Sequence, residues 1–337
     1  MPRVTIDDVA ARTGLSTATV SKAMRGIRVA DETRERILAA ARELGWTPNP
    51  HASSLASGRT GVIGLVMVFY GLWFDGRMLK ALNDAAAAAR QDLLVWTTRT
   101  LIEPQGRSAG IRSVTSRVDG LLLVDFEGIP EHEAVLREIA IPTVTIGGTV
   151  APFSSISIDN RAAAERAVDH LVELGHRRIA IAHGPASPRE HSRVSEARLA
   201  GYHRALDRAG IPRQPDAEIV TGLDLAGGTQ AFARIRDVDE DARPTAVFCC
   251  SDEVAVGLFL AATRAGVHVP GELSIVGFDD HDLAVLLGLT TIRQPVDALA
   301  ASGLEQVVAM VDGDSSQPAA HTLPVELVRR TSTAPPA

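Results

Sequence analysis

From residue 61 onward, short apolar segments alternate with amphipathic helical patterns, and this alternation constrains the fold more than any other feature of the sequence. Near-continuous apolar segments separated by helices are typical of parallel strands that are buried on both faces of a sheet. The predicted strands span residues 62–68, 93–97, 120–124, 143–146, 178–182, 218–220, 246–250, 273–278 and 290–292. The chain is therefore expected to have an α/β core.

Helices are predicted in the gaps, where apolar residues recur at helical spacing. The predicted helices span residues 77–90, 106–116, 131–138, 161–174, 195–208, 225–236, 253–265 and 296–311. Strands and helices form two series of about equal length, which predicts two similar α/β lobes without a convincing sequence repeat between them. With 337 residues, the chain is long enough for two or three domains that each bury a core.

The first 45 residues predict three short helices instead. Thr5 and Asp8 have the spacing of a capping box at the start of the first helix, and Gly14 permits the tight turn that ends it. The third helix spans about 31–44 and ends at Gly45. Ala30 stands at its start, where a serine would be a better cap.

The second of these helices lies in GLSTATVSKAMRG (14–26), a small, hydroxyl-rich and mildly basic stretch. Ser16 is a favourable N-cap, and Val20 and Ala23 can face inward along one narrow edge. The outward positions are small or polar, namely Thr17, Ala18, Ser21 and Lys22. This composition indicates a helix with a surface role rather than a core helix.

Residues 46–60 combine two prolines with small polar side chains, a composition typical of a linker. Asn49 could cap a short helix with Pro50 at its first position. Such a helix is marginal alone, because isolated helices need about 12 to 15 residues to persist in water. It is expected to form only with support from a partner.

Charge is distributed unevenly along the chain. Residues 1–60 hold nine Lys and Arg residues against six Asp and Glu residues, a net charge of +3, whereas the whole chain has a net charge of −7. A basic head on an acidic body is expected when the head alone binds a polyanion such as DNA.

Several classes of protein are disfavoured by the sequence. No apolar run approaches the roughly 20 residues of a transmembrane helix, and the N-terminus lacks the apolar core of a signal peptide, so the chain is predicted to be cytoplasmic. The adjacent Cys249 and Cys250 cannot join distant segments. Without a nucleophile elbow, phosphate-binding loop or metal-ligand cluster, neither enzymatic activity nor a cofactor is expected. His183 follows a predicted strand without an evident partner.

Short motifs in a defined order cover nearly the whole chain. The first 50 residues contain VTIDDVA (4–10), GLS (14–16), TVS (19–21), TRERI (33–37), LGW (44–46) and PN (48–49). Later motifs are RLAGY (198–202), SDEVAVG (251–257), VP (269–270), VGFDD (276–280) and LTTIRQP (289–295). In this set and order the sequence resembles the lactose-repressor/galactose-repressor (LacI/GalR) family of bacterial transcriptional regulators.

The resemblance implies an all-α helix-turn-helix headpiece, a hinge, and a two-lobed core like the periplasmic sugar-binding proteins, with parallel sheets. The expected boundaries are 1–46 for the headpiece, 47–60 for the hinge linker and hinge helix, and 61–337 for the effector-binding and dimerisation core. Within the core, the N-lobe is expected to span about 61–159 and 291–322, and the C-lobe about 160–290 and 323–337.

The resemblance also implies contacts with DNA. On the second helix, Lys22 would donate to guanine, Ala18 would meet a thymine methyl group, and Thr17 could make either kind of contact. Leu55 would insert into the minor groove at the operator centre and kink the DNA. The expected DNA-binding residues are Thr5, Ile6, Ser16, Thr17, Ala18, Thr19, Ser21, Lys22, Arg25, Arg28, Thr33, Asn49, Ala52 and Leu55.

Two positions of the second helix differ from the family's commoner residues. Many relatives carry arginine where Lys22 stands and asparagine where Arg25 stands. Lysine lacks the bidentate fork of arginine. We therefore expect these two positions to set the operator preference of this protein.

A small effector, a sugar or sugar derivative, is expected between the lobes at the carboxyl ends of the strands. Arg198 and Asp279 match the family's ligand-contacting arginine and aspartate, and such a pair can bind neighbouring hydroxyls. The alternatives are an ion pair between the lobes for these two residues, and core or dimer packing for the aromatic side chains. The expected effector-binding residues are Tyr70, Trp73, Phe74, Asp159, Arg198, Ser251, Asp252 and Asp279.

The resemblance thus predicts a homodimeric, ligand-responsive repressor of carbohydrate-utilisation genes that binds operator DNA and not a membrane. The alternative is a cytosolic sugar-binding or sensor module whose N-terminal head contacts another partner. The sequence leaves open which sugar is bound, whether it releases or promotes DNA binding, and which operator is recognised.

Overall fold

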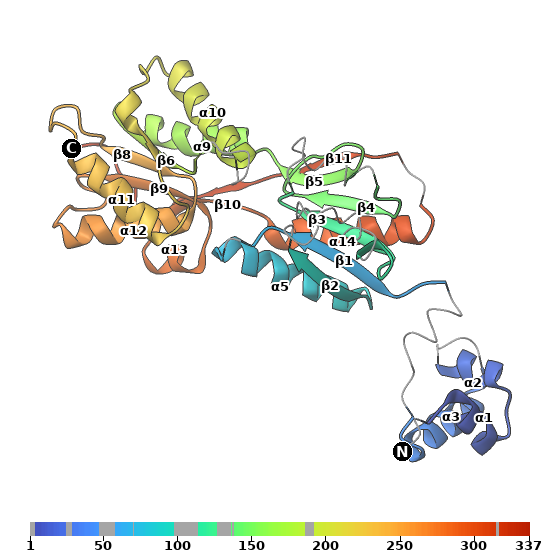
Figure 1. Cartoon of the computed structure of the whole chain (residues 1–337). Coiled ribbons are helices and arrows are strands. Elements are labelled where there is room, and N and C mark those ends of the chain that lie inside the picture. Colours follow the sequence, from blue (N-terminus) through green and yellow to red (C-terminus); the bar gives the residue numbers. More distant parts are fainter. Residues whose placement is uncertain are drawn as a thin grey trace, which may run out of the picture. The chain divides into compact units, whose positions relative to one another are not determined.

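The computed structural model describes residues 4–24, 29–46, 58–69, 71–97, 114–126, 136, 138–185, 192–314 and 317–337. Its contacts divide the chain into two compact units, Met1–Gly61 and Val62–Ala337 (Figure 1). We call the first the headpiece and the second the core.

The headpiece contains three helices, α1 (Ile6–Thr13), α2 (Thr17–Met24) and α3 (Asp31–Glu43). They share one small apolar cluster, to which every helix contributes: Val9, Ala10, Val20, Ala23, Ile37, Ala40 and Ala41. Burying a side chain such as Ile37 stabilises a fold by about 1.5–3 kcal/mol. The unit therefore has its own core, and α2 has its narrow inward edge as predicted.

Local capping fixes the ends of these helices. The backbone nitrogen of Thr5 donates to the Asp8 carboxylate at 2.8 Å, which confirms the capping box. Gly14 follows α1 with φ of +66°, in the left-handed region that glycine favours. The backbone nitrogen of Thr19 donates to the Ser16 hydroxyl at 3.2 Å. Ala30 precedes α3 without a side-chain cap, as the sequence indicated.

The described part of the core contains two six-stranded sheets. The first has the order β11-β5-β4-β3-β1-β2, and the second β12-β10-β9-β8-β6-β7. The strands of the first are β1 (Val62–Met67), β2 (Asp92–Thr97), β3 (Gly120–Val124), β4 (Thr143–Ile146), β5 (Ser154–Ile158) and β11 (Ala320–Leu323). Those of the second are β6 (Ile179–His183), β7 (Glu218–Val220), β8 (Ala246–Cys249), β9 (Ser274–Asp279), β10 (Thr290–Arg293) and β12 (Glu326–Val328).

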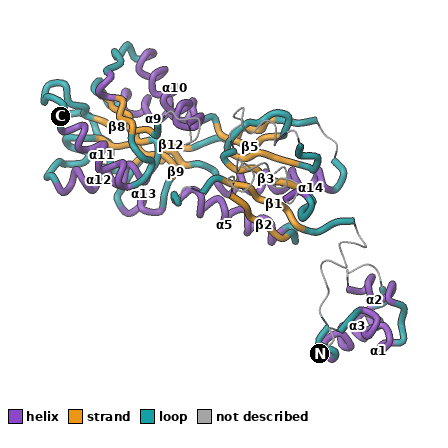
Figure 2. The backbone as a smooth tube through the Cα atoms, in the orientation of Figure 1, coloured by secondary structure: helices purple, strands orange, loops and turns teal. Residues whose placement is uncertain are grey.

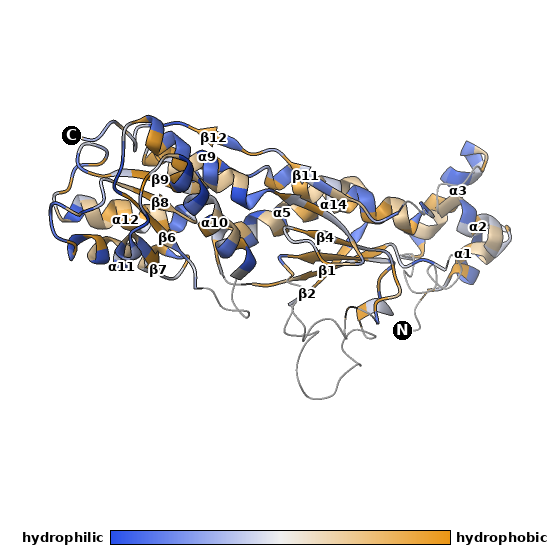
Figure 3. Cartoon of the chain, turned by 90° about the horizontal axis from the view of Figure 1, so that it is seen from above, coloured by the Kyte–Doolittle hydropathy of each residue, from blue (hydrophilic) through white to orange (hydrophobic). Residues whose placement is uncertain are grey.

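Helices flank both sheets (Figure 2). They are α5 (Trp73–Ala88), α14 (Val296–Val311), α9 (Asn160–Glu173), α10 (Ser192–Arg208), α11 (Leu225–Arg236), α12 (Asp252–Arg264) and α13 (Asp282–Leu286), with a short 3-10 helix at Pro215–Ala217. Along β6, Ile181 packs in the cluster that includes Tyr202 of α10, whereas Ala182 packs in the cluster of α11 and α12. Both faces of this sheet are therefore covered, and in Figure 3 its strands are mostly orange.

The chain passes between the two sheets more than once. After β10, which pairs with β9, it continues into α14, which packs on β3 and β4 of the first sheet. It returns through β11, beside β5, to β12 in the second sheet (Figure 1). The boundary expected at residue 291 is thus three residues too early, because β10 belongs to the second sheet up to Arg293. Strand β12 is antiparallel, an exception to the predicted parallel arrangement.

Other differences from the sequence prediction have local causes. Helix α5 begins at Trp73 rather than residue 77, because the Asp75 carboxylate accepts from the backbone nitrogen of Leu72 at 3.2 Å and caps the first turn. Strand β5 was not predicted, since three serines interrupt its apolar pattern. The helices predicted at 106–116 and 131–138 lie almost wholly outside the described residues.

Glycine allows one close helix contact that positions the later site. A Cβ on Gly201 of α10 would lie 2.3 Å from the carbonyl oxygen of Arg161 on α9. Any larger residue there would push the two helices apart. Arg198 lies one turn before Gly201, and its bond to Asn160 of α9 depends on this close approach of the two helices.

Candidate functional site

The exposed face of α2 gathers most of the described residues that were predicted to bind DNA. Thr17, Ala18 and Lys22 are exposed, whereas Val20 and Ala23 on the opposite edge are buried. Ser16, Thr19 and Ser21 are exposed or half-buried beside them. A donor, hydroxyls and a methyl group therefore stand together on one helix, a combination that matches base edges and phosphates.

Three further predicted residues lie on the neighbouring helices. Thr5 precedes α1 and is exposed, while Ile6 and Thr33 are half-buried at the starts of α1 and α3. The remaining predictions lie outside the described residues, namely Arg25, Arg28, Asn49, Ala52, Leu55 and Tyr70.

In the core, Arg198 is a buried cation held by contacts on three sides. It is 7% exposed. Its Nε donates to Asn160 Oδ1 at 2.9 Å, and its Nη1 donates to the Cys250 carbonyl at 2.5 Å. The guanidinium carbon lies 3.5 Å from the centre of the Phe278 ring. Burial lowers the pKa of Arg198, and the negative charge of Asp279 opposes this shift.

Asp279 ends β9 directly after Phe278, in a left-handed conformation with φ of +123°. Its Oδ1 accepts from Gln294 Nε2 at 2.6 Å. Burial raises the pKa of Asp279 to about 6, although Arg198 lowers it. Arg198 and Asp279 are both carried by elements of the second sheet, so they do not form an ion pair between the lobes. Each influences the pKa of the other electrostatically at the carboxyl edge of one sheet.

Asp252 is fully buried at the start of α12. Its Oδ1 accepts from Thr291 Oγ1 at 2.7 Å, and its Oδ2 accepts from the backbone nitrogen of His281 at 2.8 Å. A Cβ on Gly277 would lie 1.9 Å from Oδ1, so only glycine fits beside it. Burial raises the pKa of Asp252 to about 8. This carboxyl group therefore joins α12, β10 and the end of β9.

Two other predicted effector residues cap helices. The Ser251 hydroxyl accepts from the backbone nitrogen of Val254 at 3.2 Å and donates to the Leu223 carbonyl at 2.9 Å. The Asp159 carboxylate accepts from the backbone nitrogen of Ala162 at 2.9 Å. Both side chains lie near the carboxyl edges, and these bonds to backbone nitrogens stabilise α12 and α9.

Trp73 connects α5, which packs against the first sheet, with the second sheet's elements. Its backbone nitrogen donates to Glu253 Oε2 at 3.3 Å, and its indole Nε1 donates to Asp282 Oδ2 at 3.2 Å. Its ring lies 5.1 Å from the ring of His281. We call this set of contacts the Trp73 latch. Phe74, the next residue, is half-buried and packs on the core cluster.

Replacing Trp73 by phenylalanine is expected to weaken the latch, because phenylalanine keeps a ring but cannot donate to Asp282. We expect the loss of about 1 kcal/mol of stability, and the same loss from Asp282→Ala. The double variant should lose little more stability than either single variant, since both substitutions remove the same hydrogen bond. Thermal unfolding of the full chain and the three variants measures this, and fully additive losses would show that the two side chains do not interact.

Two residues of the site, Asp125 and Gln294, were not predicted from the sequence. Asp125 follows β3 with φ of +48°, and its negative charge acts on the pKa of Arg198 from the first sheet. A Cβ on Gly147 would lie 2.1 Å from Asp125 Oδ1, so glycine leaves room for this carboxylate. Asn160 and Gln294 hold Arg198 and Asp279. Asp125 could have been predicted as a site residue from the sequence, because it is the first charged residue after an apolar strand.

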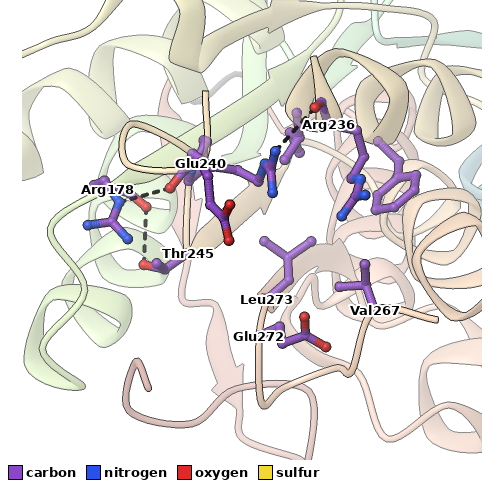
Figure 4. Close-up of a pocket in the computed structure, with 11 residues that line it drawn as sticks. Arg178, Arg236, Glu240, Thr245, Val267, Glu272 and Leu273 are labelled. Carbon is purple, nitrogen blue, oxygen red and sulfur yellow. Dashed lines mark hydrogen bonds between the residues drawn. The ribbon is translucent and has the colours of Figure 1, made fainter. Parts of the chain in front are cut away.

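A separate cavity of about 150 Å³ lies at the other edge of the second sheet (Figure 4). Arg178, Thr245 and Leu273 line it, and they precede β6, β8 and β9. The cavity is therefore at the amino ends of the strands, away from Arg198 and Asp279. Arg243 Nη2 donates to the Val238 carbonyl at 3.1 Å beside it.

The described part of the chain contains neither a candidate metal site nor a candidate membrane-spanning helix. Among those residues, no group of three His, Cys, Asp or Glu side chains could hold a metal ion. Cys249 and Cys250 are both buried and free. No described helix is long and apolar enough to span a bilayer.

Comparison with known proteins gives the family. The model of bacterial regulatory proteins of the lacI family matches residues 5–49, and that of a periplasmic-binding-protein-like domain matches residues 168–333. The transcriptional regulator DegA of Bacillus subtilis is 31% identical over 343 residues, which cover 99% of this chain and 99% of DegA. The chain belongs to the LacI family of bacterial regulatory proteins.

Solved structures of LacI-family proteins have the same fold. The Lac repressor dimer bound to operator and the anti-inducer ONPF matches with a TM-score of 0.84 and 29% identity, covering 99% of this chain and 100% of that chain. The transcriptional regulator CelR in complex with cellobiose matches with a TM-score of 0.67 and 25% identity, covering 98% and 100%. This chain is a LacI-family transcriptional regulator with a helix-turn-helix headpiece, and its relatives are regulators rather than enzymes.

Proposed function

We propose that this protein is a cytoplasmic, homodimeric repressor of carbohydrate-utilisation genes whose affinity for operator DNA is controlled by a sugar-like effector. The observation that carries the DNA-binding part is the surface of α2, where Thr17, Ala18 and Lys22 are exposed opposite a buried apolar edge. A helix of this kind can enter the major groove with its polar face against the bases. Two headpieces of a dimer would then bind the two halves of a pseudo-palindromic operator.

The proposed DNA contacts divide into two kinds. Lys22, Ala18 and Thr17 contact base edges and so determine sequence preference. The others hold the backbone and the minor groove, with Leu55 as the wedge at the operator centre. This second set comprises Thr5, Ile6, Ser16, Thr19, Ser21, Arg25, Arg28, Thr33, Asn49, Ala52 and Leu55.

The proposed effector binds where Arg198 and Asp279 meet. A buried guanidinium with a carboxylate near enough to influence its pKa can bind neighbouring hydroxyls of a sugar with charge-assisted hydrogen bonds. The CelR relative, which carries cellobiose in its complex, supports a carbohydrate. The remaining proposed effector residues are Tyr70, Trp73, Phe74, Asp159, Ser251 and Asp252.

The proposed effector site lies close to the two segments that cross between the sheets. Asp280, next to Asp279, accepts from Arg293 Nε and from Arg330 Nη2, each at 2.6 Å. Arg293 ends β10, directly before the segment that leads to α14. Its Nη1 donates to Glu326, the first residue of β12 after the segment that returns from β11, at 2.8 Å. A ligand that moves Asp279 therefore acts next to the contacts of Asp280 and Arg293, which hold the two segments that cross between the sheets. We propose that the lobes and the hinge respond through these contacts.

Replacing Lys22 by alanine tests the DNA-binding proposal. We expect specific affinity to fall about 10- to 100-fold, because one base contact contributes about 1–3 kcal/mol of discrimination. Binding to unrelated DNA should weaken much less. Operators are first selected from a random library with the wild-type protein. Fluorescence anisotropy then measures the affinity of wild type and variant for the selected operator and for unrelated DNA, at two salt concentrations.

Arg36→Ala is the matched control, since Arg36 is an exposed cation of α3 rather than of α2. It should change specific affinity less than threefold. The proposal fails if wild-type protein selects no sequence from the library. The assignment of Lys22 fails if both variants lose affinity equally on all DNA.

Effector affinity is expected to fall as the pH drops through about 6. The pKa of Asp279 is raised to about 6 by burial, so above that pH its carboxylate is ionised and accepts ligand hydroxyls. Below it, protonation removes that acceptor, and affinity falls by up to about tenfold per pH unit. This loss of affinity is not caused by unfolding. Because the pKa of Asp279 is raised in the folded state, protonating Asp279 favours the folded state.

Calorimetric titration of the best sugar ligand across about pH 5–7.5 measures this dependence. Asp279→Asn serves as the control, since its amide does not titrate. Its affinity should be weaker and flat through pH 6. A wild-type affinity that stays constant across the range would contradict the assignment.

A further inference from the structure

The cavity at the amino ends of the second sheet has an apolar floor (Figure 4). Phe232 and Ile235 of α11 line it together with Leu273, which precedes β9, and all three side chains are buried. The volume is about 150 Å³, and an engineered apolar cavity of about that size in another protein binds benzene. The cavity can therefore hold one hydrocarbon group of the size of a benzene ring.

Two side chains of opposite charge stand at the rim of this cavity. Arg236 ends α11, Glu240 follows four residues later, and both are exposed. Figure 4 shows the two side chains extending from different sides toward Leu273. In the part of the chain that the structure describes, they form no ion pair with each other, and neither side chain makes a hydrogen bond. A cation and an anion therefore face the same space with a gap between them.

Two further charges at the rim already have backbone partners. Arg243 Nη2 donates to the Val238 carbonyl at 3.1 Å, which orders its guanidinium as a second positive charge beside the cavity. Glu272 Oε2 accepts from the backbone nitrogen of His268 at 2.8 Å. The carboxylate of Glu272 is thus bound within its own loop, whereas the carboxylate of Glu240 is available to a ligand.

We propose that this cavity binds an α-amino acid with an aliphatic or phenyl side chain. The ligand carboxylate accepts from the Arg236 guanidinium, and the ligand ammonium group donates to the Glu240 carboxylate. The ligand side chain lies on the apolar floor and covers Leu273. Every charged group of the ligand then has a partner of opposite charge, and its hydrocarbon group leaves water.

This site is separate from the proposed effector site. Thr245, before β8, lines the cavity, whereas the Cys250 carbonyl, after β8, accepts from Arg198. The extended chain between Thr245 and Cys250 spans about 16 Å. The inference therefore does not rest on the proposed function, and a sugar bound at Arg198 should not compete with the amino acid.

The cavity disfavours other classes of ligand. A sugar would place hydroxyl groups against the apolar floor without hydrogen-bond partners. An alkyl carboxylate has no ammonium group for Glu240, and an alkylamine has no carboxylate for Arg236. Among amino acids, glutamate is too polar for the floor, and the indole of tryptophan is larger than the benzene-sized space.

Leucine and two of its analogues test the assignment on the full chain. 4-Methylpentanoate lacks the ammonium group of leucine, and 3-methylbutylamine lacks its carboxylate. Ligand-observed NMR titrations at constant ionic strength measure each affinity. We expect leucine to bind at least about tenfold more tightly than either analogue, because each analogue loses one charge-assisted bond.

Two charge-neutralising variants assign each bond to one side chain. Arg236→Gln should weaken the binding of leucine and 4-methylpentanoate about tenfold and leave that of 3-methylbutylamine unchanged. Glu240→Gln should weaken leucine and 3-methylbutylamine and leave 4-methylpentanoate unchanged. The matched controls are Arg234→Gln, in the same last turn of α11, and Asp239→Asn, next to Glu240. Both control residues are exposed and lie outside the cavity lining, so both variants should bind leucine like wild type.

A third variant keeps every charge and removes the space. Val267 lines the cavity, and Val267→Phe places a phenyl group where the ligand side chain would lie, so leucine binding should be lost. Thermal melting checks that each variant is folded.

The inference is overturned if leucine, valine and phenylalanine all fail to bind the wild-type protein, or if either analogue binds as tightly as leucine. It is also overturned if the Arg236 and Glu240 variants weaken all three probes equally. Loss of leucine binding in Arg198→Leu but not in Arg236→Gln would place the ligand in the proposed effector site instead. None of these results changes the proposed control of operator binding by a sugar.

Discussion

Replacing Arg198 by leucine is expected to abolish the response to effector while operator affinity changes less than about threefold. The guanidinium is buried against Phe278 and makes charge-assisted bonds to Asn160 and the Cys250 carbonyl. Without it, Asp279 loses its neighbouring cation, and the ligand loses a donor. Since hydrogen bonds to charged groups contribute about 1.5–3 kcal/mol each, affinity should fall by at least about a hundredfold.

Two further variants separate a binding role from a folding role. Arg198→Lys keeps the charge but not the planar fork, so it should retain a measurable part of the affinity. Arg208→Leu, on the exposed end of the same helix, removes ion pairs to Glu165 and Asp169 and should leave the response intact. Effector-induced release of operator DNA and thermal melting are measured for all three. A full response in Arg198→Leu would exclude Arg198 from the effector site.

Much of the fold was predictable because the elements are defined by local patterns. The capping box at Thr5 and the stop at Gly14 are set by neighbours in sequence, and both are present in the structure. Strands such as β3 are apolar throughout, which distinguishes them from amphipathic helices. Strand β5 was missed, because its buried serines are satisfied from a distant segment. The Ser154 hydroxyl, for example, accepts from the backbone nitrogen of Ala319 at 3.3 Å.

The roles of single side chains were harder to predict than their positions. Asp252 is buried in bonds to β10, and Asp159 caps α9, and neither of these structural roles was predicted. A carboxylate after a strand looks the same in sequence whether it serves a ligand or a helix. His183 shows the converse, since only the structure reveals that its Nε2 is buried and unpaired among the described residues. Burial and pairing are set by contacts between distant segments.

The exposed apolar side chains of α13 are expected to lie in the homodimer interface. Val285 and Leu286 are 63% and 79% exposed, and Leu283 is 38% exposed. Three such residues on one five-residue helix are costly in contact with water. The Lac repressor relative, which is similar over the whole chain, is a dimer on its operator. We therefore assign a second copy of this chain as the occupant of this surface.

Leu286→Glu is expected to convert the dimer into monomers and to weaken operator binding by about 10²- to 10⁴-fold. A carboxylate in an apolar interface is desolvated without a partner, which opposes association. Once the second headpiece is no longer tethered, its effective concentration at the second half-site is lost. Light scattering reports the mass, and anisotropy reports affinity for whole operators and for isolated half-sites.

Half-site binding decides between loss of assembly and damage to the headpiece. A monomer with an intact headpiece should bind a half-site as well as wild type does, because the substitution lies in the other compact unit. Val220→Glu is the control, since Val220 is a 54% exposed apolar residue on β7, and it should remain dimeric. If Leu286→Glu stays dimeric, α13 is not the interface. If it is monomeric yet binds whole operators at full strength, bivalency does not determine operator affinity.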